Sequence, residues 1–464
     1  MQAAFAVAVS EETQAMLPAL RSLSTHVWNI IRRPTAVLAF ILVLSLTSQN
    51  SHAYSVLTHE QVVDLLWKDR IAPMLLERFP RATDEDLRKA HAFAYGGSLI
   101  QDMGYYPFGN RFFSDLTHYV RSGDFVVALI NDSTDLNEYA FALGALSHYV
   151  SDNSGHPTIN RVVGIEFPKL KKKYGDIVTY GDDPKAHIRT EFGFDMTQVA
   201  HNRYTSDRYH DFIGFEVSKP VLERAFYETY GLQVSDVFGD EDLAIGTFRR
   251  SISTIIPEMT RVALLARKKE MVKEDPNFDR KKFLFYLSRT NYEKQWGKGY
   301  RRPGFGARVL AFFLKIIPKV GPFAALDFKI PTTQTEDMYI KSVNLTVEDY
   351  HSTLKQADGH ALRLINTDCD TGRKTSPGEY RLSDATYAKL LDKLSEHNFN
   401  NVPAELRANI LEYFSVPNAP LSIRTDKNEW ARVQKQLDQL RSAPGALQDA
   451  GHHPQAKTES SVKE

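Results

Sequence analysis

The sequence predicts an all-α protein, with a multi-helix domain followed by a mostly helical C-terminal region. From Leu57 to about Leu265, apolar residues recur at helical spacing, and no convincing run of alternating residues interrupts them. The chain has 464 residues, of which 42% are hydrophobic and 11% aromatic, so it can bury a sizeable core. These observations indicate a globular helical protein of more than one domain's length.

Charge and cysteine content limit the possible functions. The 57 basic and 57 acidic residues cancel, which removes the argument for a uniformly basic nucleic-acid binder. Because Cys369 is the single cysteine, neither an intramolecular disulfide nor a cysteine-based zinc site can form. Metal chemistry would therefore use His, Asp and Glu, and the chain has 15 histidines.

The first 53 residues have the features of an export signal. An apolar run from Ala36 to Leu46 follows Arg32-Arg33 and is too short to span a bilayer comfortably. Ser51-His52-Ala53 then matches a secretory cleavage site, so the mature chain is expected to begin at Tyr54. The segment before Arg32 is long for a signal peptide, which leaves an uncleaved anchor or a wrongly assigned start codon as alternatives. The expected location is outside the cell or in a bacterial envelope or periplasm.

Helix signals divide the remaining chain. Thr83 precedes an acidic first turn and predicts a helix start, and Gly104 is expected to end the helix that carries Asp102. Loops are expected near residues 105–111 and 157–183. We place the first domain at residues 54–265, a mostly helical region of unknown role at 266–441, and a disordered tail at 442–464.

The sharpest chemical signal lies around residue 150. His148 and Asp152 are four residues apart, so a helix would place an imidazole and a carboxylate on one face, where both can bind one ion. Gly155 and Pro157 are expected to end this helix, which would let His156 turn toward a neighbouring ion. Histidines on a helix also often satisfy local hydrogen bonds, and that structural reading stays open.

Five further residues have the right chemistry for metal ligands. His187 and Glu191 repeat the spacing of four residues, although such a pair is also common on helix surfaces. Asp102 and His118 could equally be a loop cap and a half-buried structural histidine. His59 follows the expected mature terminus by five residues. Cleavage would free the terminal amine and carbonyl to chelate a metal beside it, which would make processing a condition of activity.

Taken in chain order, these eight residues resemble the ligand set of the bacterial zinc-dependent phospholipase C family, which is all-helical and binds three zinc ions. The fungal single-strand-specific zinc nucleases are similar but more distant. The resemblance covers about residues 54–195 and departs from the family in two places, the short interval from Asp152 to His156 and a tyrosine in place of the usual tryptophan at Tyr54. It implies three zinc sites: Asp102, His118, His148 and Asp152; the main-chain terminus of Tyr54 with His59 and, as a bridge, Asp152; and His156, His187 and Glu191.

The chemistry of such ligands suits phosphodiester hydrolysis. Anionic phosphate oxygens repel hydroxide, whereas bound cations withdraw charge and lower the pKa of a bound water toward about 7. Asp102 is the candidate catalytic residue, placed to orient or deprotonate that water. Nitrogen and oxygen ligands fit zinc and are also compatible with manganese or iron.

The resemblance therefore implies an exported trinuclear zinc phosphodiesterase that hydrolyses phospholipids to diacylglycerol and a phosphorylated headgroup. A zinc-dependent nuclease and a non-catalytic, zinc-stabilised envelope protein are the alternatives. The sequence identifies no protein partner.

A basic and aromatic segment bears on the choice of substrate. Residues 280–329 contain twelve basic and two acidic residues, a net charge of +10, together with aromatic residues such as Trp296 and Phe312. This composition fits contact with a membrane surface better than it fits contact with single-stranded nucleic acid. An ordinary helical hairpin, with a buried apolar side and solvated charges, also explains it.

Two weaker patterns are also present. Tyr105, Tyr106 and Phe108 follow Asp102 and could cage a quaternary ammonium headgroup, stack on a base or simply pack. The segment from Asp368 to Gly372 begins like a calcium loop but lacks that motif's later ligand and glycine positions, so we interpret it as a polar turn.

Overall fold

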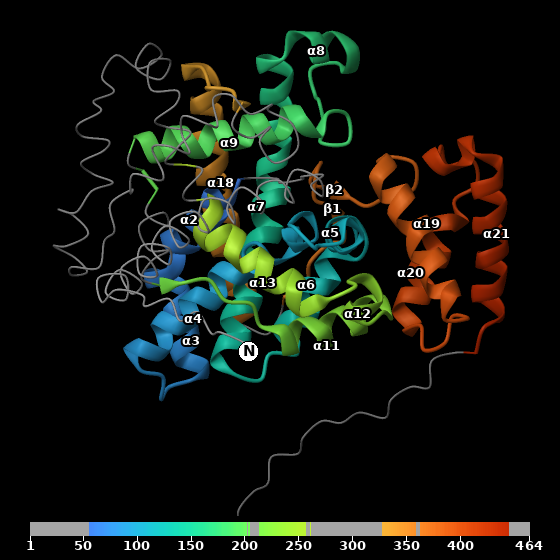
Figure 1. The fold of residues 1–464 in the computed structure, drawn as a ribbon, viewed down its shortest axis with the longest axis horizontal. Coiled ribbons are helices and arrows are strands. Elements are labelled where there is room, and N and C mark those ends of the chain that lie inside the picture. Colours follow the sequence, from blue (N-terminus) through green and yellow to red (C-terminus); the bar gives the residue numbers. More distant parts are fainter. Residues whose placement is uncertain are drawn as a thin grey trace, which may run out of the picture.

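The computed structural model describes residues 55–201, 203–204, 213–256, 260, 327–358 and 362–444. Within these ranges the chain is mostly helical with one two-stranded antiparallel sheet, which confirms the predicted all-α fold (Figure 1). The expected signal segment 1–53 and Tyr54 lie outside the described residues, as do most of the basic segment 280–329 and residues 445–464 of the expected tail.

The elements are, in chain order, α2 (Val56–Leu66), the π-helix η1 (Trp67–Ile71), α3 (Ala72–Arg78), α4 (Asp84–Gly97), the 3-10 helix η2 (Ile100–Tyr105), α5 (Arg111–Tyr119), α6 (Ser122–Asn131), α7 (Leu136–Glu166), α8 (Pro168–Tyr174), α9 (Pro184–Ala200), α11 (Lys219–Tyr230), α12 (Val234–Val237), α13 (Glu241–Arg250), the π-helix η3 (Ser251–Ile255), α18 (Thr333–Asp358), β1 (Thr367–Asp368), β2 (Arg373–Lys374), α19 (Arg381–Glu396), α20 (Ala404–Ser415), the 3-10 helix η5 (Ser422–Thr425) and α21 (Lys427–Ser442).

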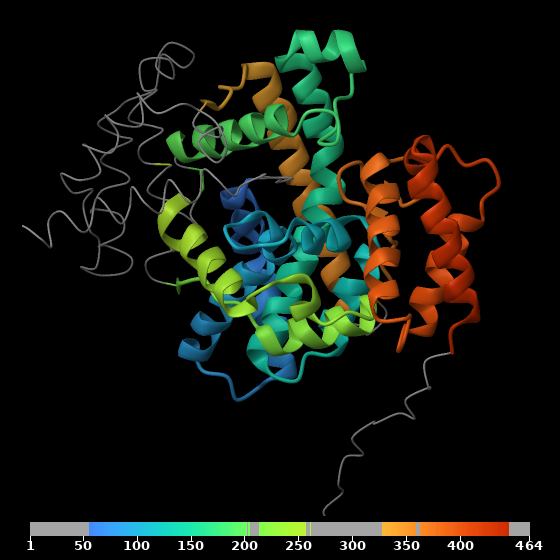
Figure 2. The ribbon, with the colours of Figure 1, turned by 45° about the vertical axis from the view of Figure 1, so that its right-hand side comes forward.

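The 31-residue helix α7 is the axis of the fold, and α4 and α18 pack along it (Figures 1 and 2). Close approach of α4 and α7 depends on glycine. A Cβ atom at Gly97 would lie 1.9 Å from the carbonyl oxygen of Phe141, and one at Gly144 would lie 2.1 Å from that of Ala94. Any larger residue at either position would push the two helices apart.

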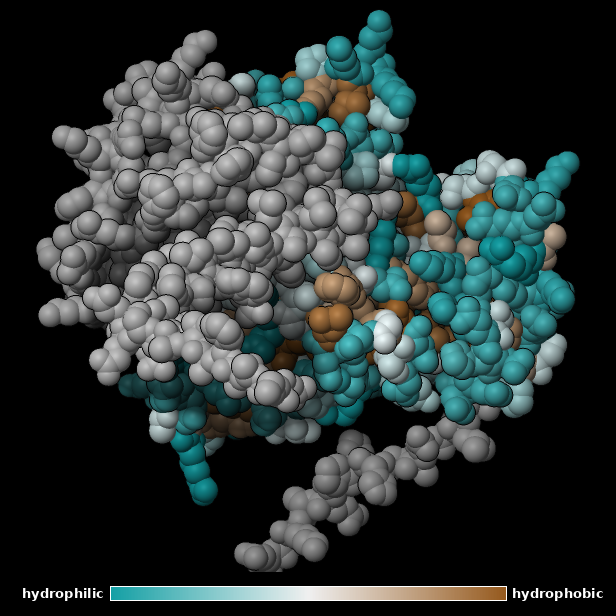
Figure 3. All heavy atoms as spheres, in the orientation of Figure 1, coloured by the Kyte–Doolittle hydropathy of each residue, from teal (hydrophilic) through white to brown (hydrophobic). Residues whose placement is uncertain are grey.

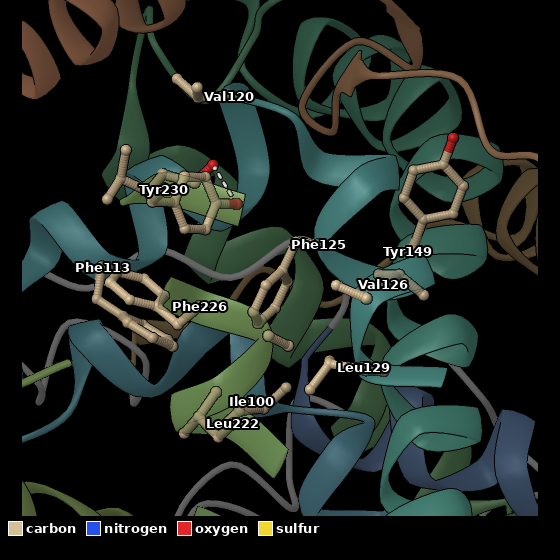
Figure 4. Packing of buried hydrophobic residues seen from close by; sticks show 14 of the residues in the cluster. Ile100, Phe113, Val120, Phe125, Val126, Leu129, Tyr149, Leu222, Phe226 and Tyr230 are labelled. Carbon is tan, nitrogen blue, oxygen red and sulfur yellow. Dashed lines mark hydrogen bonds between the residues drawn. The ribbon is translucent and has the colours of Figure 1, made fainter. Parts of the chain in front are cut away.

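Aromatic side chains fill much of the core on one side of α7. The rings of Phe113 and Phe226 stack with centroids 5.2 Å apart, and Phe125 and Tyr230 lie beside them (Figure 4). The buried Tyr230 hydroxyl donates a hydrogen bond to the Leu116 carbonyl at 3.2 Å. Burying each such ring stabilises the fold by about 1.5–3 kcal/mol, so this core holds α5, α6 and α11 together.

Helix α4 begins where the sequence predicts but ends earlier. Thr83 and Asp86 form a reciprocal capping box, with each side chain accepting from the backbone N–H of the other. The predicted stop at Gly104 is wrong, because α4 ends at Gly97 and Asp102 lies on the separate 3-10 helix η2. A tertiary contact fixes this break, since the carbonyl of Ser98 accepts a hydrogen bond from a histidine of α7.

The predicted end of α7 at Gly155 and Pro157 is also wrong. The helix continues to Glu166 with Pro157 inside it, and α8 follows, so most of the expected loop at residues 157–183 is helical. Proline inside a helix forfeits one backbone hydrogen bond. Burial of Ile159, Val162 and Val163 in the second half of α7 outweighs that loss.

The region after residue 327 is not isolated from the first domain. Helix α18 lies along α7, where the Tyr350 hydroxyl donates to the Leu143 carbonyl at 2.9 Å. Strands β1 and β2 then pair Thr367 with Lys374, and Gly372 takes a φ of +69° in the turn, which confirms the predicted polar turn. The boundary near residue 265 stays a prediction, because residues 261–326 lie outside the described ranges.

Helices α19, α20 and α21 form a group at one side of the molecule (Figures 1 and 2). Their facing sides are apolar, with the stacked rings of Tyr387 and Tyr413 3.8 Å apart, while the visible outer surface is mainly hydrophilic (Figure 3). Among the helices of the described ranges, none combines the length and the hydropathy that a membrane span requires.

Candidate metal centre

The structure gathers the predicted ligands from five separate elements. They are His59 on α2, Asp102 on η2, His118 on α5, His148, Asp152 and His156 on α7, and His187 and Glu191 on α9. Each of these eight residues is at most 2% exposed. Tyr54, the ninth predicted ligand, lies outside the described residues, although Ser55 and Val56 directly after it are buried.

Asp152 lies at the centre of the first cluster. Its Oδ2 atom is 3.2 Å from Nε2 of His148 and 3.3 Å from Nε2 of His118. Its Oδ1 atom is 3.6 Å from Nε2 of His59, and Asp102 Oδ1 is 3.5 Å from Nε2 of His118. Asp152 therefore faces the ligands of two of the three expected zinc sites with different oxygens.

Ligand atoms in this first cluster are close enough to share ions. His59, His148 and Asp152 each offer an atom within 4.8 Å of the others, and so do Asp102, His118 and His148. Nitrogen and carboxylate oxygen are the donors that zinc takes in proteins without cysteine ligands.

The second cluster joins α7 and α9. Glu191 Oε1 lies 3.5 Å from Nδ1 of His187 and 4.0 Å from Nε2 of His156. Because α7 continues to Glu166, His156 lies within this helix, eight residues or just over two turns beyond His148. His156 therefore approaches Glu191 from within α7, and the predicted end of the helix is not needed.

Backbone carbonyls fix the orientation of four of the histidine rings. A carbonyl can only accept a hydrogen bond, so the ring nitrogen facing it must carry the proton and the other nitrogen can present its lone pair to a metal. The four bonds run from His118 Nδ1 to Ser114 O at 2.7 Å, from His148 Nδ1 to Ser98 O at 2.9 Å, from His187 Nε2 to Val178 O at 2.6 Å and from His156 Nδ1 to Cys369 O at 2.5 Å.

Four polar atoms of the second cluster make no hydrogen bond within the part of the chain that the structure describes. Both carboxylate oxygens of Glu191, Nε2 of His156 and Nδ1 of His187 are buried without a hydrogen bond. Leaving a buried polar group unsatisfied costs about 1–3 kcal/mol, and more for a charged one. Two imidazoles and a carboxylate aimed at a common space fit a divalent cation, which would satisfy all of them.

Burial shifts the pKa values of three of the predicted ligands. It lowers the pKa of His187 to about 3 and, together with the nearby His148, lowers that of His59 to about 3. Burial also raises the pKa of Glu191 well above its ordinary value, and the negative charge of Asp152 adds to this effect. The two histidines are thus neutral at pH 7, the form in which imidazole binds a metal.

The negative charge of Asp152 opposes the effect of burial at His118, whose pKa it raises. Although burial lowers the pKa of His118, the carboxylates of Asp152 and Asp102 raise it to about 9. Burial would raise the pKa of Asp152, but the adjacent His148 and His118 hold it well below its ordinary value. Asp152 is therefore ionised and needs a cation, either imidazolium or metal, beside it.

The aromatic residues after Asp102 diverge. The ring of Tyr105 lies 6.1 Å from that of His118 and borders the first cluster, whereas Tyr106 packs edge-on against Phe248. Phe108 points outward and is 46% exposed. The predicted aromatic group therefore does not act as one wall at the site.

Sequence reasoning missed one carboxylate at the site. Asp370 lies in the turn between β1 and β2, and its Oδ1 atom is 3.6 Å from Nδ1 of His156. The polar turn was visible in the sequence, but nothing there indicated that it contacts α7 more than 200 residues earlier in the chain.

Comparison with protein families agrees with this arrangement. The family model described as zinc dependent phospholipase C matches residues 58–240, a range that contains all eight predicted ligands that the structure describes. The chain has no match among the curated proteins or among the solved structures. Over residues 58–240 the chain is therefore similar to the zinc-dependent phospholipase C family, as the order of its predicted ligands implies.

Proposed function

We propose that this protein is an exported, three-zinc phosphodiesterase that hydrolyses phospholipids to diacylglycerol and a phosphorylated headgroup. The family domain supports zinc-dependent hydrolysis of phosphodiesters in general. The observation that carries the more specific proposal is the convergence of eight buried ligands from five elements on two adjoining clusters.

The proposed ligand sets follow these clusters. Asp102, His118, His148 and Asp152 would hold one zinc, and His59, Asp152 and the main-chain terminus of Tyr54 a second. His156, His187 and Glu191 would hold the third. The mutual distances of at most 4.8 Å among Asp102, His118 and His148 support the first set, and the approach of Glu191 to His156 and His187 supports the third.

Zinc bound at such a centre supplies positive charge to the phosphate oxygens and makes water more acidic. In the proposed reaction, Asp102 orients a water molecule and accepts its proton. The water oxygen forms a bond to phosphorus, the bond from phosphorus to the glycerol oxygen breaks, and a proton passes to that oxygen. The burial of Asp102 and Asp152 keeps bulk water from competing for their charges.

A phospholipid is the favoured substrate because the family is defined by phospholipase C activity. Tyr105 beside His118 could contact a headgroup. The proposed membrane contact through residues 280–329 rests on their composition, since only residues 327–329 of that segment are described.

The test uses the mature chain beginning at Tyr54. Bound metal is measured by plasma mass spectrometry, and turnover is measured side by side on phosphatidylcholine vesicles and on single-stranded DNA. About three zinc ions with release of diacylglycerol are expected. Cleavage of DNA alone would replace the proposal with a nuclease, and zinc without either activity would favour a structural role.

Export is tested separately with the full chain. Expression in a bacterium followed by N-terminal sequencing is expected to show cleavage after Ala53 and a mature terminus at Tyr54. Retention of residues 1–53 in a membrane fraction would show an anchor instead, while leaving the hydrolase proposal unaffected.

A further inference from the structure

We infer that the β1–β2 hairpin, residues 367–374, is a positioning element of the metal centre, and that Asp370 within it orients His156 as a zinc ligand. The inference rests on the proposed three-zinc function. It gives the C-terminal region, whose role the sequence left unknown, a direct part in building the site.

Two hairpin groups meet the same nitrogen of His156. The carbonyl of Cys369 accepts a hydrogen bond from Nδ1 at 2.5 Å, and Oδ1 of Asp370 lies 3.6 Å from that atom. Both groups favour a proton on Nδ1, so Nε2 is left to face Glu191. A carboxylate beside the outer nitrogen of a metal-bound histidine fixes its tautomer and makes it a stronger ligand.

Asp370 is itself held firmly in place. Its Oδ2 atom accepts hydrogen bonds from the hydroxyls of Tyr119, at 2.8 Å, and Tyr380. Its backbone carbonyl accepts from Nδ2 of Asn160 on α7 at 2.8 Å. With the side chain 2% exposed, these bonds leave Oδ1 in one fixed position toward His156.

The hairpin also ties two ligand-bearing helices together. The N–H of Cys369 donates to the carbonyl of His118 at 3.1 Å, at the end of α5. On α7, the turn approaches the carbonyl of Asn153, and a Cβ atom at Gly372 would lie 2.4 Å from that oxygen. This is the carbonyl that Pro157, lacking an N–H, cannot bond within the helix.

Asp370 is better placed to orient His156 than to bind zinc. Its Oδ1 atom faces Nδ1, the nitrogen already engaged by a carbonyl, whereas the second cluster forms around Nε2. The residue also lies outside the range 58–240 that matches the family model, so this contact is a feature of the chain's own C-terminal region.

The test compares zinc binding by the mature wild-type chain and the variant Asp370→Asn. Total zinc is titrated in buffers of set free zinc, and the third zinc is expected to bind about 10–100-fold more weakly in the variant. The two ions of the first cluster should bind unchanged. Tyr380→Phe, which removes one donor to Asp370, should give a smaller loss in the same direction and serves if Asp370→Asn does not fold.

Asp384→Asn is the matched control. Asp384 is also a buried C-terminal aspartate, 1% exposed, and it accepts hydrogen bonds from Gly378, Tyr413 and Ser422. None of these is a predicted ligand, so the variant should lose thermal stability while keeping all its zinc affinity. An equal loss of zinc from both variants would show general destabilisation and overturn the inference.

A second readout does not depend on zinc. Nitrogen chemical shifts of labelled histidines report which nitrogen of His156 carries the proton, and the metal-free wild type should show it on Nδ1. Asp370→Asn should raise the fraction of the other tautomer. Unchanged shifts and unchanged zinc affinity in the variant would overturn the role of Asp370. A wild type that binds fewer than three zinc ions, but whose His156 tautomer still depends on Asp370, would overturn the proposed function alone.

Discussion

Substitution of Asp152 by asparagine is the most direct perturbation of the metal centre. The two residues have nearly the same shape, so the change removes a charge from a fully buried position with little change in packing. In the wild type this charge faces three imidazole nitrogens at 3.2, 3.3 and 3.6 Å. Asparagine would present a neutral amide to the same nitrogens.

The expected loss is large because these groups are buried together. Removing one partner from a buried charged pair costs about 3–5 kcal/mol, which corresponds to roughly two to four orders of magnitude in an equilibrium constant. Since Asp152 faces both His59 and His118, the affinity for both zinc ions of the first cluster should fall by this order. The His156 and Glu191 cluster should keep its ion.

The assay combines zinc content at set free zinc, circular dichroism, and turnover on phosphatidylcholine vesicles. A folded Asp152→Asn protein with about one zinc and no measurable turnover is the expected result. A folded variant that keeps all its zinc and a tenth or more of the wild-type turnover would refute the reasoning. An inactive parent, with a variant that unfolds, would favour a zinc-stabilised structural protein.

Three further substitutions probe the scaffold. Gly372→Ala should displace the hairpin from Asn153, and the positive φ alone costs an alanine about 1–2 kcal/mol. Thermal unfolding should show lower stability, and zinc titration should show weaker binding of the third zinc. Unchanged binding of that zinc would contradict the close approach of Gly372 to Asn153. Glu336 has a pKa lowered to about 2 by the hydrogen bond from His201. A depressed pKa stabilises the fold above the ordinary pKa of 4.5, and this stability, about 1 kcal/mol for a partly exposed pair, is lost as the pH falls from 4.5 to 2. Unfolding midpoints of wild type and Glu336→Gln should therefore differ at pH 6 and converge near pH 2, whereas a difference independent of pH would exclude this ion pair as the cause. Thr83→Ala removes the cap of α4 and should cost about 0.5–2 kcal/mol in urea unfolding without changing zinc content; a loss of zinc would show that the cap acts on the site.

The sequence could predict which residues lie together in two pairs because their spacing is local. His148 with Asp152, and His187 with Glu191, each lie one helical turn apart, so helix geometry alone brings each pair to one face. The same local reasoning failed at Pro157, where a proline within a helical pattern was interpreted as an end. Burial of the following apolar residues sustains α7 through that position, and burial is a property of the whole fold.

The chain's own sequence determined its helical fold, the start of α4 at Thr83 and the residue types of the candidate metal centre. These depend on apolar spacing, caps and ligand type, all of which act between residues a few positions apart. Only the tertiary structure placed Asp370 and the carbonyl of Cys369 against His156. That contact joins residues more than 200 positions apart, and no periodicity encodes such a pairing, because it depends on the path of every helix between them.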